Sequence, residues 1–241
     1  TLSALHVTTS LIAKEDTEPT QNEIKQEYDK NKSDEFKHGE LRSLNYVFWK
    51  KVPSLQDTND VENLVKELLN RAKSKEDFSA LANEYTMDPS NQGTKGGDLG
   101  WFKKGRMVKP FEEAAFKANK NQIIGPVLSR FGYHIIHIRD KRIDADNNDE
   151  ILASHILIKI EMSPTTLSNL KRDATLFSYD AQDNGFEEAV KEHNLITSKI
   201  EKLKENDLTI KGLGNLRSAV RFAFNNEINT VSEILENDQY F

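Results

Sequence analysis

The sequence has no cysteine and no long apolar run. With no Cys among its 241 residues, the chain has no disulfide, no thiolate nucleophile and no zinc site built from thiolates. No stretch approaches the ~18 consecutive apolar residues of a membrane-spanning helix, and no segment has the pattern of a secretory signal peptide. We therefore expect no membrane contact within this piece of chain, and any membrane anchor of the full-length protein would lie outside it.

Acidic residues outnumber basic ones, but the imbalance is reversed in one region. The formal net charge is −6, yet residues 92–142 contain eleven Lys and Arg against four Asp and Glu. A basic stretch is one signature of nucleic-acid binding. Here the cations alternate with Gly, Pro and apolar residues and do not follow one helix face, which favours a solvated surface. We expect no nucleic-acid partner; the alternative would require binding that weakens steeply with salt.

The length favours two globular units preceded by a polar segment. The run from Pro19 to Glu23, PTQNE, has the spacing of a helix capping box with Thr20 at its start. Residues 1–38 are too short and too polar for a core. We expect them to form a helical lead-in segment.

Residues 39–142 have the pattern of a small α+β domain. The run from Leu41 to Trp49 is rich in β-branched and aromatic residues, which favours a strand. Apolar residues at helical spacing predict a long helix starting near Asp57 or Asn59, a shorter one over Phe78 to Tyr85, and a third from Pro110. A turn-rich loop spans 89–100, and YHIIHIR predicts a closing strand.

A second unit is predicted over 151–241, after a polar linker at 143–150. Its first ten residues, ILASHILIKI, are nearly all apolar. Later segments parallel the first domain: FEEAVKEHN parallels FSALANEYT, and AFNNEINTVSEIL parallels AFKANKNQIIGPVL. This register places Tyr240 and Phe241 opposite Tyr133 and His134. We expect a degenerate copy of the first domain that stops inside its last strand.

Three ordered motifs resemble the parvulin family of peptidyl-prolyl isomerases. They are DFSALANEYTMDPS at 77–90, GGDLGWFKKGRMVKPFEEAAF at 96–116 and FGYHII at 131–136. The resemblance implies an α+β fold with a small antiparallel sheet and three to four helices, followed by the degenerate, truncated second unit. It also implies catalysis without a metal or another cofactor.

The resemblance assigns the family's site residues to specific positions in this sequence. The resemblance implies that Asp88 lies beside the substrate carbonyl and that His134 is the second of two histidines that organise the site. It also implies an apolar pocket for the proline ring, formed by Leu99, Met107, Phe111 and Phe131. Taken singly, these residues have ordinary explanations: Asp88-Pro89 opens turns, Met107 and Phe111 at i, i+4 suit a core, and His134 suits a structural role.

One position departs from the family. Where the first strand of a parvulin usually carries a histidine, this chain has Asn45, aligning SLNYVF with ASHILI. Asn forms hydrogen bonds but does not titrate, and we expect it to take the histidine's place in the site. In the second unit His155 matches the first histidine, Phe241 stands where the second would be, and nothing matches Asp88. We expect that unit to be inactive.

The function predicted is isomerisation of X-Pro bonds in unfolded or envelope proteins. The lead-in, one preserved domain and a degenerate copy resemble periplasmic foldases of the PpiD and SurA kind, which implies proline-containing polypeptide clients and a periplasmic or envelope location. The alternative is a chaperone that holds extended apolar peptides in the same groove without catalysis, since equal binding of planar and twisted bonds gives no acceleration.

Overall fold

The computed structural model describes residues 18–33, 39–91, 93 and 95–241. It forms two compact units, and neither is continuous in sequence: one joins the chain up to Val47 with Ile196–Thr230, and the other joins Phe48–Leu195 with Val231–Phe241. This division differs from the boundaries predicted at 38/39, 142/143 and 150/151. None of the helices in the described ranges is both long and apolar enough to cross a bilayer.

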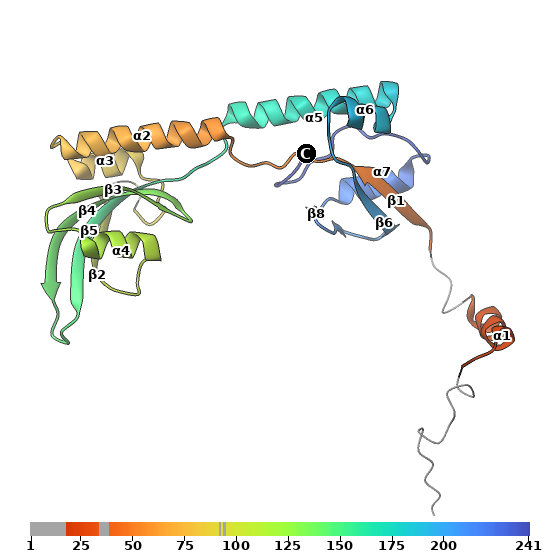
Figure 1. Ribbon diagram of the computed structural model, residues 1–241, viewed down its shortest axis with the longest axis horizontal. Helices are drawn as coiled ribbons and strands as arrows, with labels where there is room; N and C mark the ends of the chain where they lie inside the picture. Colours follow the sequence, from red (N-terminus) through yellow and green to blue (C-terminus); the bar gives the residue numbers. More distant parts are fainter. Residues whose placement is uncertain (1–17, 34–38, 92, 94) are drawn as a thin grey trace, which may run out of the picture. The chain divides into compact units, whose positions relative to one another are not determined.

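The larger unit is built on a four-stranded antiparallel sheet in the order β2-β5-β4-β3. The strands are β2 (Asp98–Lys103), β3 (Ile123–Ser129), β4 (Gly132–Ile143) and β5 (Asp149–Ile158). Figure 1 shows α2 (Leu55–Lys73) and α3 (Phe78–Tyr85) over one face of this sheet and α4 (Lys109–Lys117) over the other. The α+β architecture with a small antiparallel sheet is confirmed.

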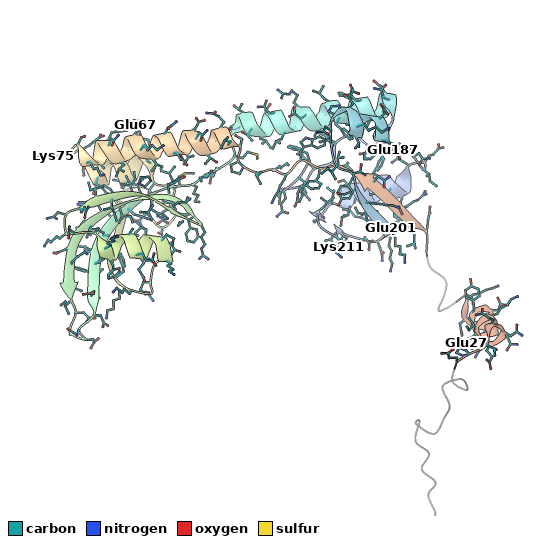
Figure 2. The ribbon with its side chains drawn as sticks, viewed as in Figure 1. Glu27, Glu67, Lys75, Glu187, Glu201 and Lys211 are labelled. Carbon is teal, nitrogen blue, oxygen red and sulfur yellow. The ribbon has the colours of Figure 1, made fainter. Side chains whose placement is uncertain are left out.

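Strand alternation sorts the core into two layers, one on each face of the sheet. On β4, Ile135 packs on the side of α2 and α3, whereas its neighbour Ile136 packs on the side of α4. On β5, Ile156 and Ala153 divide in the same way. Figure 2 shows the charged side chain of Glu67 on the side of α2 that points away from the sheet. The site described below lies on the α4 side.

The helix starts follow from local capping. α2 begins at Leu55, earlier than predicted, because the Ser54 hydroxyl accepts the N–H of Asp57 while the Asp57 carboxylate accepts the N–H of Ser54. The same carboxylate accepts the N–H of Ser163 and the hydroxyl of Thr166, at the start of α5 (Pro164–Asn184). α4 has Pro110 in its first turn, as predicted.

The predicted linker at 143–150 is a hairpin turn. β4 continues to Ile143, whose Cα partner is Asp149 at the start of β5. The Asp144 carboxylate accepts the backbone N–H of Asp146 and of Asn148, which closes the turn. Polar composition suits a tight hairpin as well as a linker, and the local hydrogen bonds of Asp144 decide between them. Residues 151–158 therefore belong to the same sheet as β4 and do not begin a separate domain.

The remaining elements carry the rest of the predicted second unit. α5 is followed by α6 (Phe186–Glu192) in the larger unit. The smaller unit contains α1 (Gln21–Asn31), β6 (Ser198–Lys204), the short pair β7 (Thr209–Ile210) and β8 (Gly214–Asn215), and α7 (Arg217–Asn225). In it β1 (Leu41–Tyr46) pairs antiparallel with β6.

The predictions for the two ends of the chain have different outcomes. The Thr20 capping box that starts α1 is confirmed, while residues 1–17 and 34–38 of the predicted lead-in lie outside the described residues. Tyr240, expected to fall in a last strand, forms an isolated antiparallel bridge with Lys50.

Candidate functional site

Two buried histidines lie side by side on neighbouring strands. His134 of β4 and His155 of β5 point to the α4 side of the sheet, with 3% and 5% of their surface exposed. Their rings are stacked with centroids 5.6 Å apart, and the Nδ1 atoms are 3.4 Å apart. The edge-on ring of Phe111 lies 5.2 Å from His134 and 5.8 Å from His155. The histidine pair is thus held in place by an aromatic wall from α4.

Asp88 joins this pair from the loop after α3. Its Oδ2 lies 2.8 Å from Nε2 of His155. Its Oδ1 accepts the backbone N–H of Ser90 at 3.0 Å and the Ser90 hydroxyl at 2.8 Å. The loop is itself fixed to β5, because the N–H of Met87 donates to the carbonyl of Leu157 at 2.7 Å. The Asp88 carboxylate is therefore oriented from two sides while remaining partly accessible.

Burial and hydrogen bonding set the charges of these groups. For Asp88 burial raises the pKa, but the hydrogen bonds from Ser90 and His155 outweigh it, so the pKa is lowered and the group is a carboxylate at neutral pH. Burial first and the neighbouring His155 second lower the pKa of His134 to about 4, and the opposing effect of Asp88 is smaller. Burial also lowers the pKa of His155 against the opposing hydrogen bond to Asp88. Both imidazoles are neutral at pH 7.

These protonation states define one direction of hydrogen bonding. A carboxylate only accepts, so Nε2–H of His155 donates to Asp88 and its Nδ1 is left as an acceptor. Nδ1–H of His134 then donates to that Nδ1, and Nε2 of His134 accepts the Ser129 hydroxyl at 2.7 Å. The Ser129 oxygen in turn accepts the N–H of Phe131. The result is a polar chain, Ser129–His134–His155–Asp88, with all donors pointing toward Asp88.

The predicted pocket residues lie around this polar chain with different exposures. Phe111 is only 2% exposed and belongs to the core below the histidines, so it supports the site more than it lines an opening. Leu99 and Met107 pack against the same core but keep accessible surface. Phe131 is 48% exposed, with the Arg130 guanidinium 4.7 Å from its ring centre. Met107, Leu99 and Phe131 therefore offer the apolar surface that a ligand could reach.

The structure corrects the placement of Asn45. This residue is exposed on β1, in the smaller unit, and its Cα partner is Lys199 of β6. The place next to His134 is taken by His155, which the alignment of ASHILI with SLNYVF had marked as a first-histidine position but assigned to another unit. The signal was in the sequence; local patterns do not reveal which sheet a strand joins. His137, on the other face, packs against Phe78.

Two glycines of the motifs make close approaches to β5. A side chain on Gly97, which has φ of 72°, would overlap the carbonyl oxygen of His155. One on Gly132, with φ of 130°, would overlap the carbonyl oxygen of Ile158. The N–H of His155 also donates to the carbonyl of Gly97 at 2.9 Å. The glycine motifs are therefore shaped to receive this strand. In the part of the chain that the structure describes, no three His, Asp or Glu side chains gather as a metal site.

Known proteins are similar to part of this chain in sequence. The family model of the PPIC-type PPIASE domain matches residues 43–142. The foldase protein PrsA of Geobacillus kaustophilus is 39% identical over 129 residues, 54% of this chain and 40% of that protein. Foldase protein PrsA 1 of Bacillus cereus is 50% identical over 76 residues, covering 32% and 25%. The chaperone SurA of Methylococcus capsulatus is 38% identical over 90 residues, covering 37% and 20%.

Among solved structures, the crystal structure of the peptidylprolyl isomerase PrsA from Bacillus anthracis is 21% identical and covers 73% of this chain and 66% of its own. Its TM-score of 0.27 does not establish a shared arrangement of the whole chain. The chain spans between 20% and 40% of the length of the three relatives. The domain match and the three motifs nevertheless agree over one region: the chain contains a PPIC-type peptidyl-prolyl isomerase domain, of the parvulin family.

Proposed function

We propose that this chain catalyses the cis–trans isomerisation of X-Pro bonds at the site formed by Asp88 and the histidine pair. The observation that carries the proposal is the ionised Asp88, held by Ser90 and His155 at the edge of a largely apolar site. Leu99, Met107 and Phe131 supply accessible apolar surface for a proline ring, and Phe111 supports the site from beneath.

The chemistry needs no cofactor. A planar amide is stabilised by resonance that places negative charge on the carbonyl oxygen, and the barrier to rotation is about 18–20 kcal/mol. A carboxylate beside that oxygen disfavours the charge-separated form, and this penalty fades as the bond twists. Each 1.36 kcal/mol by which the site prefers the twisted form gives about a tenfold gain in rate. Asp88 has the charge and the fixed orientation for this role.

The histidine pair acts on Asp88 in this mechanism. His155 donates to Asp88, and His134 and Ser129 hold His155 in the tautomer that makes this donation possible. Neutral imidazoles add no positive charge to the floor of the site, so the carboxylate keeps its full effect on the substrate amide. The pair therefore positions Asp88 without neutralising it.

An Asn45 in the place of a histidine would favour the alternative, a chaperone without catalysis. His155 fills that place, which removes the argument for an incomplete site. The complete polar chain favours catalysis over passive binding.

A protease-coupled assay on a short Ala-Pro peptide tests the proposal. We expect the full chain to accelerate isomerisation and Asp88→Ala to reduce kcat/KM at least about tenfold, the effect of losing 1.4 kcal/mol of transition-state preference. Asp60→Ala, an exposed carboxylate on α2, is the matched control and should retain full activity. Equal background rates for the unmodified chain and Asp88→Ala would refute catalysis.

At the level of the whole protein, we propose a folding factor of the cell envelope. The named relatives are a foldase and a chaperone, and they support unfolded, proline-containing polypeptides as clients and a location outside the cytoplasm. Delayed refolding of a proline-limited client in the presence of Asp88→Ala, compared with the unmodified chain, would support the folding role.

A further inference from the structure

The chain contains the same order of elements twice. β1, the long α2 and the short α3 are followed later by β5, the long α5 and the short α6, and the counterpart of α4 is α7. The long helices have 19 and 21 residues and the short ones 8 and 7. Serines cap both long helices: Ser54 caps α2 and Ser163 caps α5. The repeat noticed in the sequence is therefore a repeat of structure.

The strands of these two repeats pair crosswise. β2 of the first repeat pairs antiparallel with β5, the leading strand of the second. β6 of the second repeat pairs antiparallel with β1, the leading strand of the first. Thus β2 pairs with the first strand of the second repeat, and β6 pairs with the first strand of the first repeat. A reciprocal pattern of this kind is the arrangement of swapped strands within one chain.

The residues at which the PPIC-type match begins and ends also support an exchange of strands. The PPIC-type match begins at residue 43, on β1, and ends at residue 142, before β5. In the structure the sheet of that domain contains β5 and not β1. Gly97 and Gly132, both inside the matched region, make their close approaches to β5. The matched region is therefore packed around a strand that lies outside it in sequence.

A polar junction lies where the two connections reach their helices. The Asp57 carboxylate accepts from Ser54 at the start of α2 and from Ser163 and Thr166 at the start of α5. Only residues 47–54 separate β1 from α2, and only 159–163 separate β5 from α5. The hydrogen bonds of Asp57 thus join these two short connections. An exchange of β1 and β5 requires both connections to change direction.

We propose that β1 and β5 have exchanged places between the two repeats, and that this exchange supplies the isomerase domain with His155 in place of Asn45. The inference rests on the proposed function for its catalytic consequence, but its structural part stands independently. With β1 in the sheet, the position beside His134 would carry an amide. With β5 in the sheet, it carries an imidazole whose Nε2 reaches Asp88 at 2.8 Å. His155 is then a positioning residue that acts through Asp88.

Two engineered disulfides test the exchange in the full chain, which has no cysteine of its own. Asn45→Cys with Lys199→Cys would link β1 to β6, and Lys103→Cys with Glu150→Cys would link β2 to β5, because each pair is directly opposite in its ladder. Opposed residues in antiparallel strands have Cα atoms about 4.5–5.5 Å apart, within disulfide range. Thr209→Cys with Asn215→Cys, across β7 and β8, is the control that touches neither exchanged strand.

We expect both test disulfides to form within single chains on mild oxidation, as seen by mass spectrometry and non-reducing gels. This readout does not depend on activity, so its failure is distinct from a failure of the proposed function. Oxidised and reduced forms should have isomerase rates within about twofold of each other, like the control. Failure of either bond to form, bonds between chains, or loss of activity on oxidising the Asn45→Cys/Lys199→Cys protein would overturn the exchange.

His155→Asn tests the catalytic consequence, because it places in β5 the residue that β1 carries. We expect kcat/KM to fall at least about tenfold and its acidic limb to move to higher pH, since Asp88 loses a hydrogen bond that helps to keep its pKa low. The same change made in the oxidised Asn45→Cys/Lys199→Cys protein should give the same loss. An unchanged rate and pH profile would show that His155 does not serve the site.

Discussion

Lowering the pH should destabilise the larger unit in a window set by His134. The pKa of this histidine is lowered from 6.5 to about 4 in the folded state, chiefly by burial. The unfolded chain therefore binds a proton more readily than the folded one between these values. Stability is fully present above pH 6.5 and is lost as the pH falls through this window.

The size of the loss follows from the two pKa values. A shift of one pKa unit corresponds to about 1.36 kcal/mol, so the complete transition is worth at most about 3 kcal/mol. Between pH 7 and pH 5 the same linkage gives about 2 kcal/mol, and relaxation around the protonated ring reduces this to about 1–2 kcal/mol. His155 and His137, whose pKa values are also lowered by burial, add losses of the same sign.

Urea unfolding at pH 7 and pH 5 measures the effect, with tryptophan fluorescence as the probe because Trp49 and Trp101 both lie in the larger unit. We expect the unfolding free energy to fall by at least about 1 kcal/mol in the unmodified chain, and by less in His134→Asn. Equal stability at the two pH values, or the same decline in the variant, would refute the view that His134 is buried and neutral.

Three further predictions concern packing and charge at the site. Phe111→Ala should lower the unfolding free energy by about 3–5 kcal/mol, because the buried ring supports both histidines; urea unfolding checks this, and a loss below about 1 kcal/mol would contradict it. Gly97→Ala should destabilise far more than Gly93→Ala, since both glycines have positive φ but only Gly97 faces the carbonyl of His155; thermal melting compares them, and equal effects would count against a close β5. Ser90→Ala should raise the pKa of Asp88 and shift the acidic limb of kcat/KM to higher pH, whereas an unmoved profile would separate Asp88 from catalysis.

Much of the fold follows from local patterns. α2 and α3 have the apolar spacing that buries Leu68 and Leu81, and Pro110 marks the first turn of α4. β2 was missed because its sequence, DLGWFK, follows two glycines and resembles a turn; pairing with β5, a partner distant in sequence, makes it a strand. Periodicity describes the face of an element, and long-range pairing decides where the element lies.

The candidate site was also predicted only in part. Asp88 and His134 lie in the same site, as the motifs predicted, because both belong to the matched region. They are linked through His155, which forms a hydrogen bond with each of them. The sequence prediction placed Asn45 in the site and His155 in a second unit, because ILASHILIKI is apolar enough for any buried strand. Nothing in the composition of that run distinguishes the sheet of the first repeat from a sheet of its own.

Exchange spectroscopy on an Ala-Pro peptide mixed with a small amount of the full chain tests the central claim most directly. Uncatalysed isomerisation takes tens to hundreds of seconds, so cross peaks between the cis and trans forms are absent from the peptide alone. We predict that the chain produces these cross peaks and that Asp88→Ala abolishes them. Peptide signals that shift on binding but show no exchange with the unmodified chain would contradict an isomerase at this site.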